Sequence, residues 1–187
     1  MKSPKKILQE KSLKKAKKRN NRKREIKNLE DIKSAGILFE RDSDSTAANM
    51  QKLARFLHEQ NIKVDVLAFV DIKKPTPEFS EKKSLELFYK KDLNWYKKPN
   101  NEMVTNFINK RFDLLIKADF SEQYPLKYIC TASKSALVAG PDDGLKQVYD
   151  FIIEGHQKDV NNYHQQLIHY LSVINQKTHL NKPNYAE

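Results

Sequence analysis

Basic residues crowded near the N-terminus are the part of this sequence whose chemistry is clearest. From Lys14 to Arg24 the sequence is KKAKKRNNRKR, in which eight of eleven residues are Lys or Arg. Cations at this density displace counterions from a polyanion, and an arginine guanidinium can hold a phosphate through two hydrogen bonds. We expect contacts with nucleic-acid phosphates from Lys5, Lys6, Lys11, Lys14, Lys15, Lys17, Lys18, Arg19, Arg22, Lys23, Arg24 and Lys27.

The basic residues are distributed very unevenly along the chain. The first 33 residues hold 14 Lys and Arg against four acidic residues, whereas the remaining 154 hold 21 basic and 20 acidic residues. This division predicts a basic arm over 1–33, an α/β domain over 34–176 and a frayed tail over 177–187. Good helix formers predict a helix over 1–30, and repulsion between its like charges favours an arm that is helical, or disordered until bound to a polyanion.

RNA is the polyanion that this arm favours. No groove-reading DNA-binding motif is visible, and basic arms of this kind are typical of proteins that bind structured RNA. An anionic membrane is an alternative, but the arm contains no Trp, Phe or Tyr to insert beneath the headgroups. A solvated arm without a partner is the plainest alternative.

A second set of residues interleaves aromatic and basic side chains. Such a pattern can stack on bases while it neutralises phosphates, although the aromatic residues could instead cover an edge of the core. We expect a contribution to nucleic-acid binding from Lys90, Lys91, Trp95, Lys97 and Lys98, within a wider group that also contains Lys82, Lys83, Tyr89 and Tyr96.

Acidic residues follow three predicted strands and suggest a different function. Asp42 and Ser43, Asp71, and Asp119 would meet at the edge of a parallel sheet where α/β proteins bind ligands. This is the basis of an alternative, a small enzyme or ligand-binding domain. Helix capping explains the same residues without a ligand, and no glycine-rich phosphate loop follows the first strand, so we expect no catalytic residue, metal or cofactor.

The hydrophobic pattern places these residues on alternating strands and helices. A run of apolar residues predicts a strand over 34–40, a capped helix follows over 46–60, and a second strand over 62–70 completes a parallel crossover unit. Further strands are expected around 87–89, 112–117, 135–140 and 148–153, with helices at 102–109, 125–133 and 159–176. The predicted fold is a single three-layer Rossmann-like or flavodoxin-like α/β domain with a mostly parallel sheet of four to five strands.

The remaining reactive residue types indicate no further site. The single cysteine, Cys130, lies in an apolar stretch and is expected to be a buried hydrophobe in a reducing compartment. We interpret His156, His164 and His169 as surface residues because their spacing does not form a metal pair. No apolar run is long enough to span a membrane and no secretory signal is visible, which predicts a cytoplasmic protein.

Four segments resemble one protein family. SAGILFE, KKDLNWYKKP, FDLLIKAD and PLKYICTASKSALVAG are similar to segments of a family of small uncharacterised proteins from Bacteroidota, a domain of unknown function. The resemblance covers about residues 34–176, with the basic arm ahead of it. It implies a small α/β protein and transfers no residue role. We therefore expect an RNA-binding accessory protein associated with rRNA, the ribosome and its proteins, rather than an enzyme.

Overall fold

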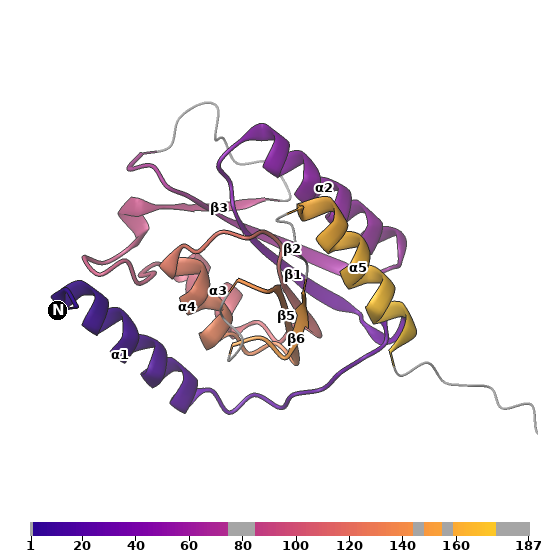
Figure 1. Cartoon of the computed structure of the whole chain (residues 1–187), viewed down its shortest axis with the longest axis horizontal. Helices are drawn as coiled ribbons and strands as arrows, with labels where there is room; N and C mark the ends of the chain where they lie inside the picture. The colour runs from indigo at the N-terminus through magenta and orange to yellow at the C-terminus, as the bar shows by residue number, and fades with distance from the viewer. Residues whose placement is uncertain (1, 75–84, 144–147, 155–158, 175–187) are drawn as a thin grey trace, which may run out of the picture.

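The computed structural model describes residues 2–74, 85–143, 148–154 and 159–174 (Figure 1). Within these ranges six strands form one sheet, in the order β3-β2-β1-β4-β5-β6, and every neighbouring pair is parallel. The strands are β1 (Ser34–Glu40), β2 (Lys63–Val70), β3 (Glu86–Tyr89), β4 (Leu114–Lys117), β5 (Leu137–Pro141) and β6 (Phe151–Ile153).

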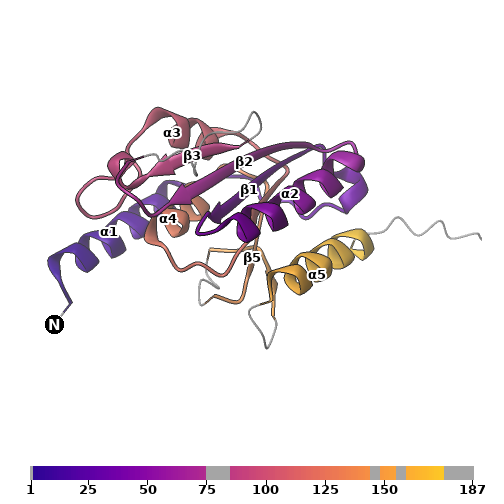
Figure 2. The same ribbon diagram turned by 90° about the horizontal axis from the view of Figure 1, so that it is seen from above.

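Helices cover both faces of this sheet, as Figures 1 and 2 show. Helices α2 (Asp44–Glu59) and α5 (Val160–Val173) lie on one face, and α3 (Glu102–Asn109) and α4 (Tyr124–Ala132) lie on the other. Helix α1 (Pro4–Arg19) packs against the outside of α4. The molecule is thus a three-layer domain to which α1 adds an outer helix.

The central strands are buried on both faces, which explains their nearly continuous apolar sequences. Along β1, Ile37 and Phe39 join the core cluster beneath α2 and α5, whereas Leu38 joins the cluster beneath α3 and α4. Cys130 is buried in the second cluster, as predicted, and burial raises the pKa of its thiol to about 12. A thiol in this setting stays protonated and unreactive at neutral pH.

The predicted α/β class with a parallel sheet is confirmed, and the strand order is that of the Rossmann-like arrangement. The sheet has six strands instead of the predicted four to five, because the short segments β3 and β6 both pair with it as its two edges. No helix in the described ranges is long and apolar enough to cross a bilayer.

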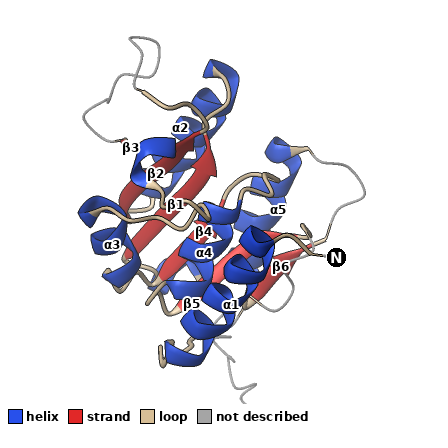
Figure 3. Ribbon diagram, turned by 90° about the vertical axis from the view of Figure 1, so that its left-hand side faces the viewer, coloured by secondary structure: helices blue, strands red, loops and turns tan. Residues whose placement is uncertain are grey.

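The N-terminal segment differs from the single helix predicted over 1–30. Helix α1 ends at Arg19, and the chain then runs extended across the domain from Asn20 to Asn28. A short 3-10 helix, η1 (Leu29–Asp31), joins this extended stretch to β1. Figure 3 shows α1 lying over the layer that contains α4. We call residues 20–28 the anchoring segment, since their polar side chains bond to the domain.

Candidate nucleic-acid interface

Helix α1 is a capped helix with one side turned toward α4. The Ser3 hydroxyl accepts a hydrogen bond from a backbone N–H of the first turn, and Pro4 occupies the first helical position. Leu8, Leu13 and Ala16 are half-buried, although no residue of α1 is fully buried. Apart from the exposed Ile7, the few apolar residues of the helix therefore face the domain.

Hydrogen bonds of Gln9 help to fix α1 on the domain. The Gln9 side-chain amide donates to the carbonyl oxygen of Tyr96 at 3.0 Å, and the Tyr124 hydroxyl donates to the carbonyl oxygen of Gln9 at 3.3 Å. Burial is the main reason that the pKa of Tyr124 is raised, so this phenol remains a donor at neutral pH. Gln9 thereby joins α1 both to α4 and to the loop that holds Tyr96.

The opposite side of α1 presents cations to solvent. Lys11, Lys14 and Lys18 follow an i, i+3, i+7 spacing, which places them on the side of the helix away from α4. Lys5 is half-buried. Lys17 is exposed but makes a further contact. The other exposed cations of the helix are Lys6, Lys11, Lys14, Lys15, Lys18 and Arg19. We call these six the α1 basic face.

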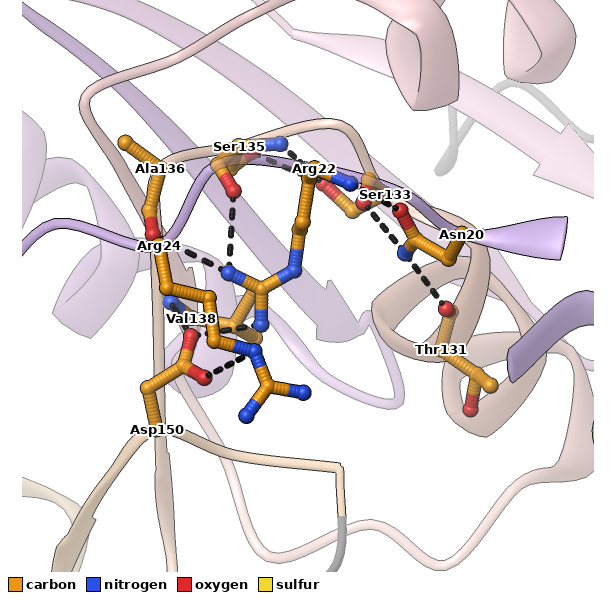
Figure 4. Close-up of polar contacts among 9 residues, drawn as sticks. All are labelled: Asn20, Arg22, Arg24, Thr131, Ser133, Ser135, Ala136, Val138 and Asp150. Atoms are coloured by element: carbon orange, nitrogen blue, oxygen red, sulfur yellow. Dashed lines mark hydrogen bonds and ion pairs between the residues drawn. The ribbon is translucent and has the colours of Figure 1, made fainter. Parts of the chain in front are cut away.

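In the anchoring segment, several polar side chains are bonded to the domain instead of being exposed as on α1 (Figure 4). The side-chain amide of Asn20 donates to the carbonyl oxygens of Thr131 at 3.0 Å and Ser133 at 2.8 Å, at the C-terminal end of α4. These bonds hold the chain extended at the point where α1 ends. They also explain why the helix does not continue to residue 30.

Arg22 lies inside the domain. Its guanidinium donates to the carbonyl oxygens of Ser135 and Ala136 at 3.1 and 3.0 Å, and its Nη2 atom lies 2.6 Å from Oδ2 of Asp150 (Figure 4). The side chains of Arg22 and Asp150 are only 6% and 8% exposed. The Asp150 carboxylate also accepts the backbone N–H of Val138, so β5, β6 and the anchoring segment are joined through one charge pair.

Two further cations of the anchoring segment have carboxylate partners. Arg24 is 66% exposed, and its Nε atom lies 3.3 Å from Oδ1 of Asp150. Lys27 lies 2.6 Å from Oδ1 of Asp113, and this hydrogen bond raises the pKa of Lys27. Burial alone would raise the pKa of Asp113, but hydrogen bonds from Lys27 and from the backbone N–H groups of Lys33 and Ser34 hold it below its usual range.

The structure thus divides the twelve predicted cations into two groups. Lys23 is exposed like the α1 basic face, whereas Arg22 and Lys27 are engaged by the domain. The end of the segment is fixed by Asn28, whose amide donates to the carbonyl oxygens of Ser172 and Ile174 at the C-terminal end of α5. Of the cations predicted to contact a ligand, those that remain exposed therefore lie mainly on α1.

The predicted aromatic and basic set forms a tight loop beside α1. An antiparallel bridge joins Leu93 to Pro99, and between them Trp95 is 66% exposed while Tyr96 is half-buried. The Lys98 ammonium lies 5.1 Å from the ring centroid of Tyr128 on α4. We call residues 93–99 the Trp95 loop.

The other lysines of this set are arranged around β3. Lys90 pairs with Asp71 at 3.1 Å, and the Lys91 ammonium lies 5.7 Å from the ring centroid of Tyr89. The predicted contributions of Lys82 and Lys83 lie outside the described residues. The arm and this set are far apart in the sequence, and the hydrogen bond between Gln9 and Tyr96 brings them together.

The acidic residues at the carboxyl edge of the sheet are engaged in internal contacts. The Asp42 carboxylate accepts hydrogen bonds from the hydroxyls of Ser43 and Thr46, and Ser43 caps α2. Asp71 pairs with Lys90, as described above. Capping and ion pairing therefore account for these positions, and the described residues contain no group of three or more His, Cys, Asp and Glu side chains that could hold a metal.

Asp119 forms the most deeply buried of these contacts. Its carboxylate accepts a hydrogen bond from the backbone N–H of Glu40 at 2.6 Å and pairs with the ammonium of Lys117, a residue with no exposed surface. This carboxylate neutralises a buried cation, which is a structural requirement in itself. The signal for this pair in the sequence is Lys117 itself, because a lysine inside a buried strand needs a carboxylate partner.

His164 also lies at this edge and corrects a prediction. It is buried and its Nε2 atom lies 2.7 Å from the carbonyl oxygen of Ala118, rather than on the surface. Burial lowers its pKa, so the ring is neutral at neutral pH. His169 is exposed as predicted, and His156 lies outside the described residues.

Comparison with known proteins identifies one family. Residues 5–174 match the family described as Family of unknown function (DUF6913). The match begins within α1, so it includes the basic helix and the anchoring segment, whereas the resemblance seen in the sequence began at residue 34. No curated protein matches the chain.

Proposed function

The chain belongs to this family of unknown function, and we propose that it is a cytoplasmic RNA-binding accessory protein that associates with the ribosome. In this proposal α1 lies along the phosphates of rRNA, and the α/β domain docks on neighbouring RNA or ribosomal protein. The ribosome is the densest body of folded RNA in the cytoplasm, which makes it the natural target of a helix with this charge.

The observation that carries the proposal is the direction in which the α1 basic face points. Lys11, Lys14 and Lys18 are exposed on the side of the helix away from α4, while the apolar residues of α1 other than Ile7 are turned to the domain. A docked helix presents its cations in a fixed row, so binding costs less ordering entropy than it would for a disordered arm. Such a row attracts phosphates and gives affinity that falls steeply with salt.

The two alternatives receive less support from the geometry. A membrane-bound helix needs bulky apolar residues on its outer side, and those of α1, apart from Ile7, are half-buried toward the domain. A ligand site at the carboxyl edge needs available groups, and the carboxylates of Asp71 and Asp119 are both paired with lysines. These observations favour a polyanion as the partner.

Charge reversal on α1 tests the proposal without disturbing the anchoring segment. A variant carrying Lys11→Glu, Lys14→Glu and Lys18→Glu should keep its helix, because the new carboxylates relieve repulsion between like charges one turn apart. It should remain at the top of a sucrose gradient on which the wild-type protein sediments with ribosomes at low salt. The slope of log K against log salt for purified RNA should become shallower by about 2, as three lost phosphate contacts predict.

The matched control reverses three exposed cations outside α1 and the anchoring segment. Lys52→Glu, Arg55→Glu and Lys63→Glu, on α2 and at the start of β2, change the net charge by the same amount. This variant should sediment with ribosomes like the wild type. If both variants lose binding equally, attraction comes from net charge and not from α1; if the wild type stays at the top at low salt, ribosome association is refuted.

A further inference from the structure

We infer that Trp95 is a stacking platform for an unpaired base of the RNA that α1 binds, so that the protein prefers single-stranded or looped RNA to duplex. This inference rests on the proposed function and adds the class of RNA. It joins two parts of the chain that are 87 residues apart between Gln9 and Tyr96.

Trp95 is exposed in a way that packing does not explain. A tryptophan that covered an edge of the core would be largely buried, but this side chain is 66% exposed. Its described ring contact is with Tyr96, edge to face, at 5.5 Å between ring centroids and 84° between planes. Most of the indole surface therefore remains open to solvent, where an apolar side chain of this size gains nothing unless a partner covers it.

The Trp95 loop holds this side chain in a defined position. The Asn94 side-chain oxygen accepts the backbone N–H groups of Tyr96 and Lys98 at 3.2 and 2.9 Å, and the Asn94 backbone N–H donates to the Lys98 carbonyl oxygen at 2.9 Å. Lys97 has a positive φ of 67°, a conformation that is costly for a residue other than glycine. A loop that is closed by its own bonds and carries backbone strain presents Trp95 at little further entropic cost on binding.

The loop also lies next to positive charge. The hydrogen bond from Gln9 to the Tyr96 carbonyl oxygen places the residue after Trp95 against α1. On the helix, Gln9 lies about one turn from Lys5 and three residues from the exposed Lys6. A strand whose phosphates follow the α1 basic face would bring its bases to this end of the helix. Aromatic stacking beside cations is the arrangement by which proteins hold unpaired bases, and a base within a duplex is not available for it.

Tryptophan emission, excited at wavelengths that tyrosine does not absorb, reports on this residue alone, because Trp95 is the only tryptophan of the chain. We expect oligouridylate to quench the emission of the full-length protein at low salt, and a duplex RNA with the same number of phosphates to leave it nearly unchanged. Vesicles containing an anionic lipid serve as a third ligand. Insertion into their interface would instead shift the emission to shorter wavelength.

Substitution then measures how much the indole contributes. Trp95→Ala should weaken oligouridylate binding about tenfold, the loss of one stacked base, and leave duplex binding within about twofold. Trp95→Phe, which keeps an aromatic face, should retain most of the affinity. Tyr170→Ala is the matched control, since Tyr170 is 47% exposed on α5, across the sheet from α1.

The outcomes separate this inference from the proposed function. If oligouridylate and duplex bind the wild type equally, emission does not change and Trp95→Ala binds normally, the stacking inference is wrong while RNA binding by α1 stands. If neither RNA binds the wild type at low salt, both fail. A blue shift with anionic vesicles, together with no response to oligouridylate, would overturn the inference in favour of a membrane contact.

Discussion

Helix α1 and the anchoring segment that follows it are both rich in lysine and arginine, but their side chains have opposite surroundings. On α1, Lys11, Lys14 and Lys18 extend into solvent from a helix with no fully buried residue. In the anchoring segment, Arg22 is 6% exposed and Lys27 is held by a carboxylate of the domain. Adjacent stretches of similar charge thus expose their cations to solvent in one case and bond them to the domain in the other.

This difference shows that charge density identifies a polyanion-binding segment only when the partners of each cation are known. A guanidinium that already has two carbonyl oxygens and a carboxylate gains nothing from a phosphate and would lose a buried contact by turning to one. The first 33 residues therefore overstate the charge offered to a ligand. The same comparison makes the two stretches separable by experiment.

The largest expected effect is a difference between two truncations. Deleting residues 1–19 removes α1 alone, and we expect the shortened protein to unfold cooperatively in urea with a loss of about 1–2 kcal/mol. Deleting residues 1–30 also removes Arg22, Asn28 and the buried Leu29 and leaves Asp150 without its main partner. That protein should lose about 5 kcal/mol or more, enough to abolish a cooperative transition in a domain of ordinary stability.

Circular dichroism during urea titration measures both truncations. Equal stability of the two proteins would show that the anchoring segment contributes nothing to the domain, and it would restore the picture of a detachable arm over 1–33. Loss of folding after deletion of residues 1–19 alone would contradict the division at Asn20.

A single substitution narrows the comparison to one ion pair. Arg22→Met should lower the free energy of unfolding by about 3 kcal/mol, because it leaves the carboxylate of Asp150 nearly buried with only the exposed Arg24 nearby. Lys18→Met makes the same chemical change on α1 and should alter stability by less than about 0.5 kcal/mol. If the two variants had the same urea midpoint, the distinction between the anchoring segment and the α1 basic face would be refuted.

The sequence was sufficient for most of the fold because the elements follow their hydrophobic periods. β1 and α3 have the bounds that were predicted, and the alternation of strands and helices is the one expected for a parallel sheet. The end of α1 was missed because the lysines and arginines on both sides are good helix formers, and the low helix propensity of Asn20 and Asn21 was given too little weight. The tertiary hydrogen bonds of Asn20 hold the chain extended there.

The division of the basic residues could not be predicted because each partner is distant in the chain. Asp150 lies 128 residues from Arg22, and Asp113 lies 86 residues from Lys27. One signal was present in the sequence: Asp150 directly precedes the apolar edge strand β6, and a carboxylate buried there needs a cation or hydrogen-bond donors. Which cation it receives depends on the path of the anchoring segment across the sheet, which no local pattern specifies.

The smallest expected effect concerns the ion pair of Lys27 with Asp113. It is measured as a change in how the free energy of unfolding depends on pH. The folded-state pKa of Asp113 lies below its usual range, so its contribution to stability is present above about pH 4 and is lost as pH falls through the folded-state pKa. Lys27→Met removes the hydrogen bond that lowers this pKa but keeps the burial that raises it. The variant should be about 1 kcal/mol less stable near neutral pH, and its acid unfolding should begin at higher pH than that of the wild type.

Asp113→Asn sharpens this test because it removes the titrating group. Its stability should depend less on pH than that of the wild type between about pH 5 and 2. In the wild type the Asp113 carboxyl of the unfolded chain binds a proton in this range, whereas the native carboxylate, with its lower pKa, stays ionised longer. Urea midpoints across this range measure both variants. Parallel curves for the wild type and Lys27→Met would mean that the backbone N–H groups of Lys33 and Ser34 hold the pKa of Asp113 down without Lys27. Lys27 would then belong with the available cations of α1 rather than with Arg22.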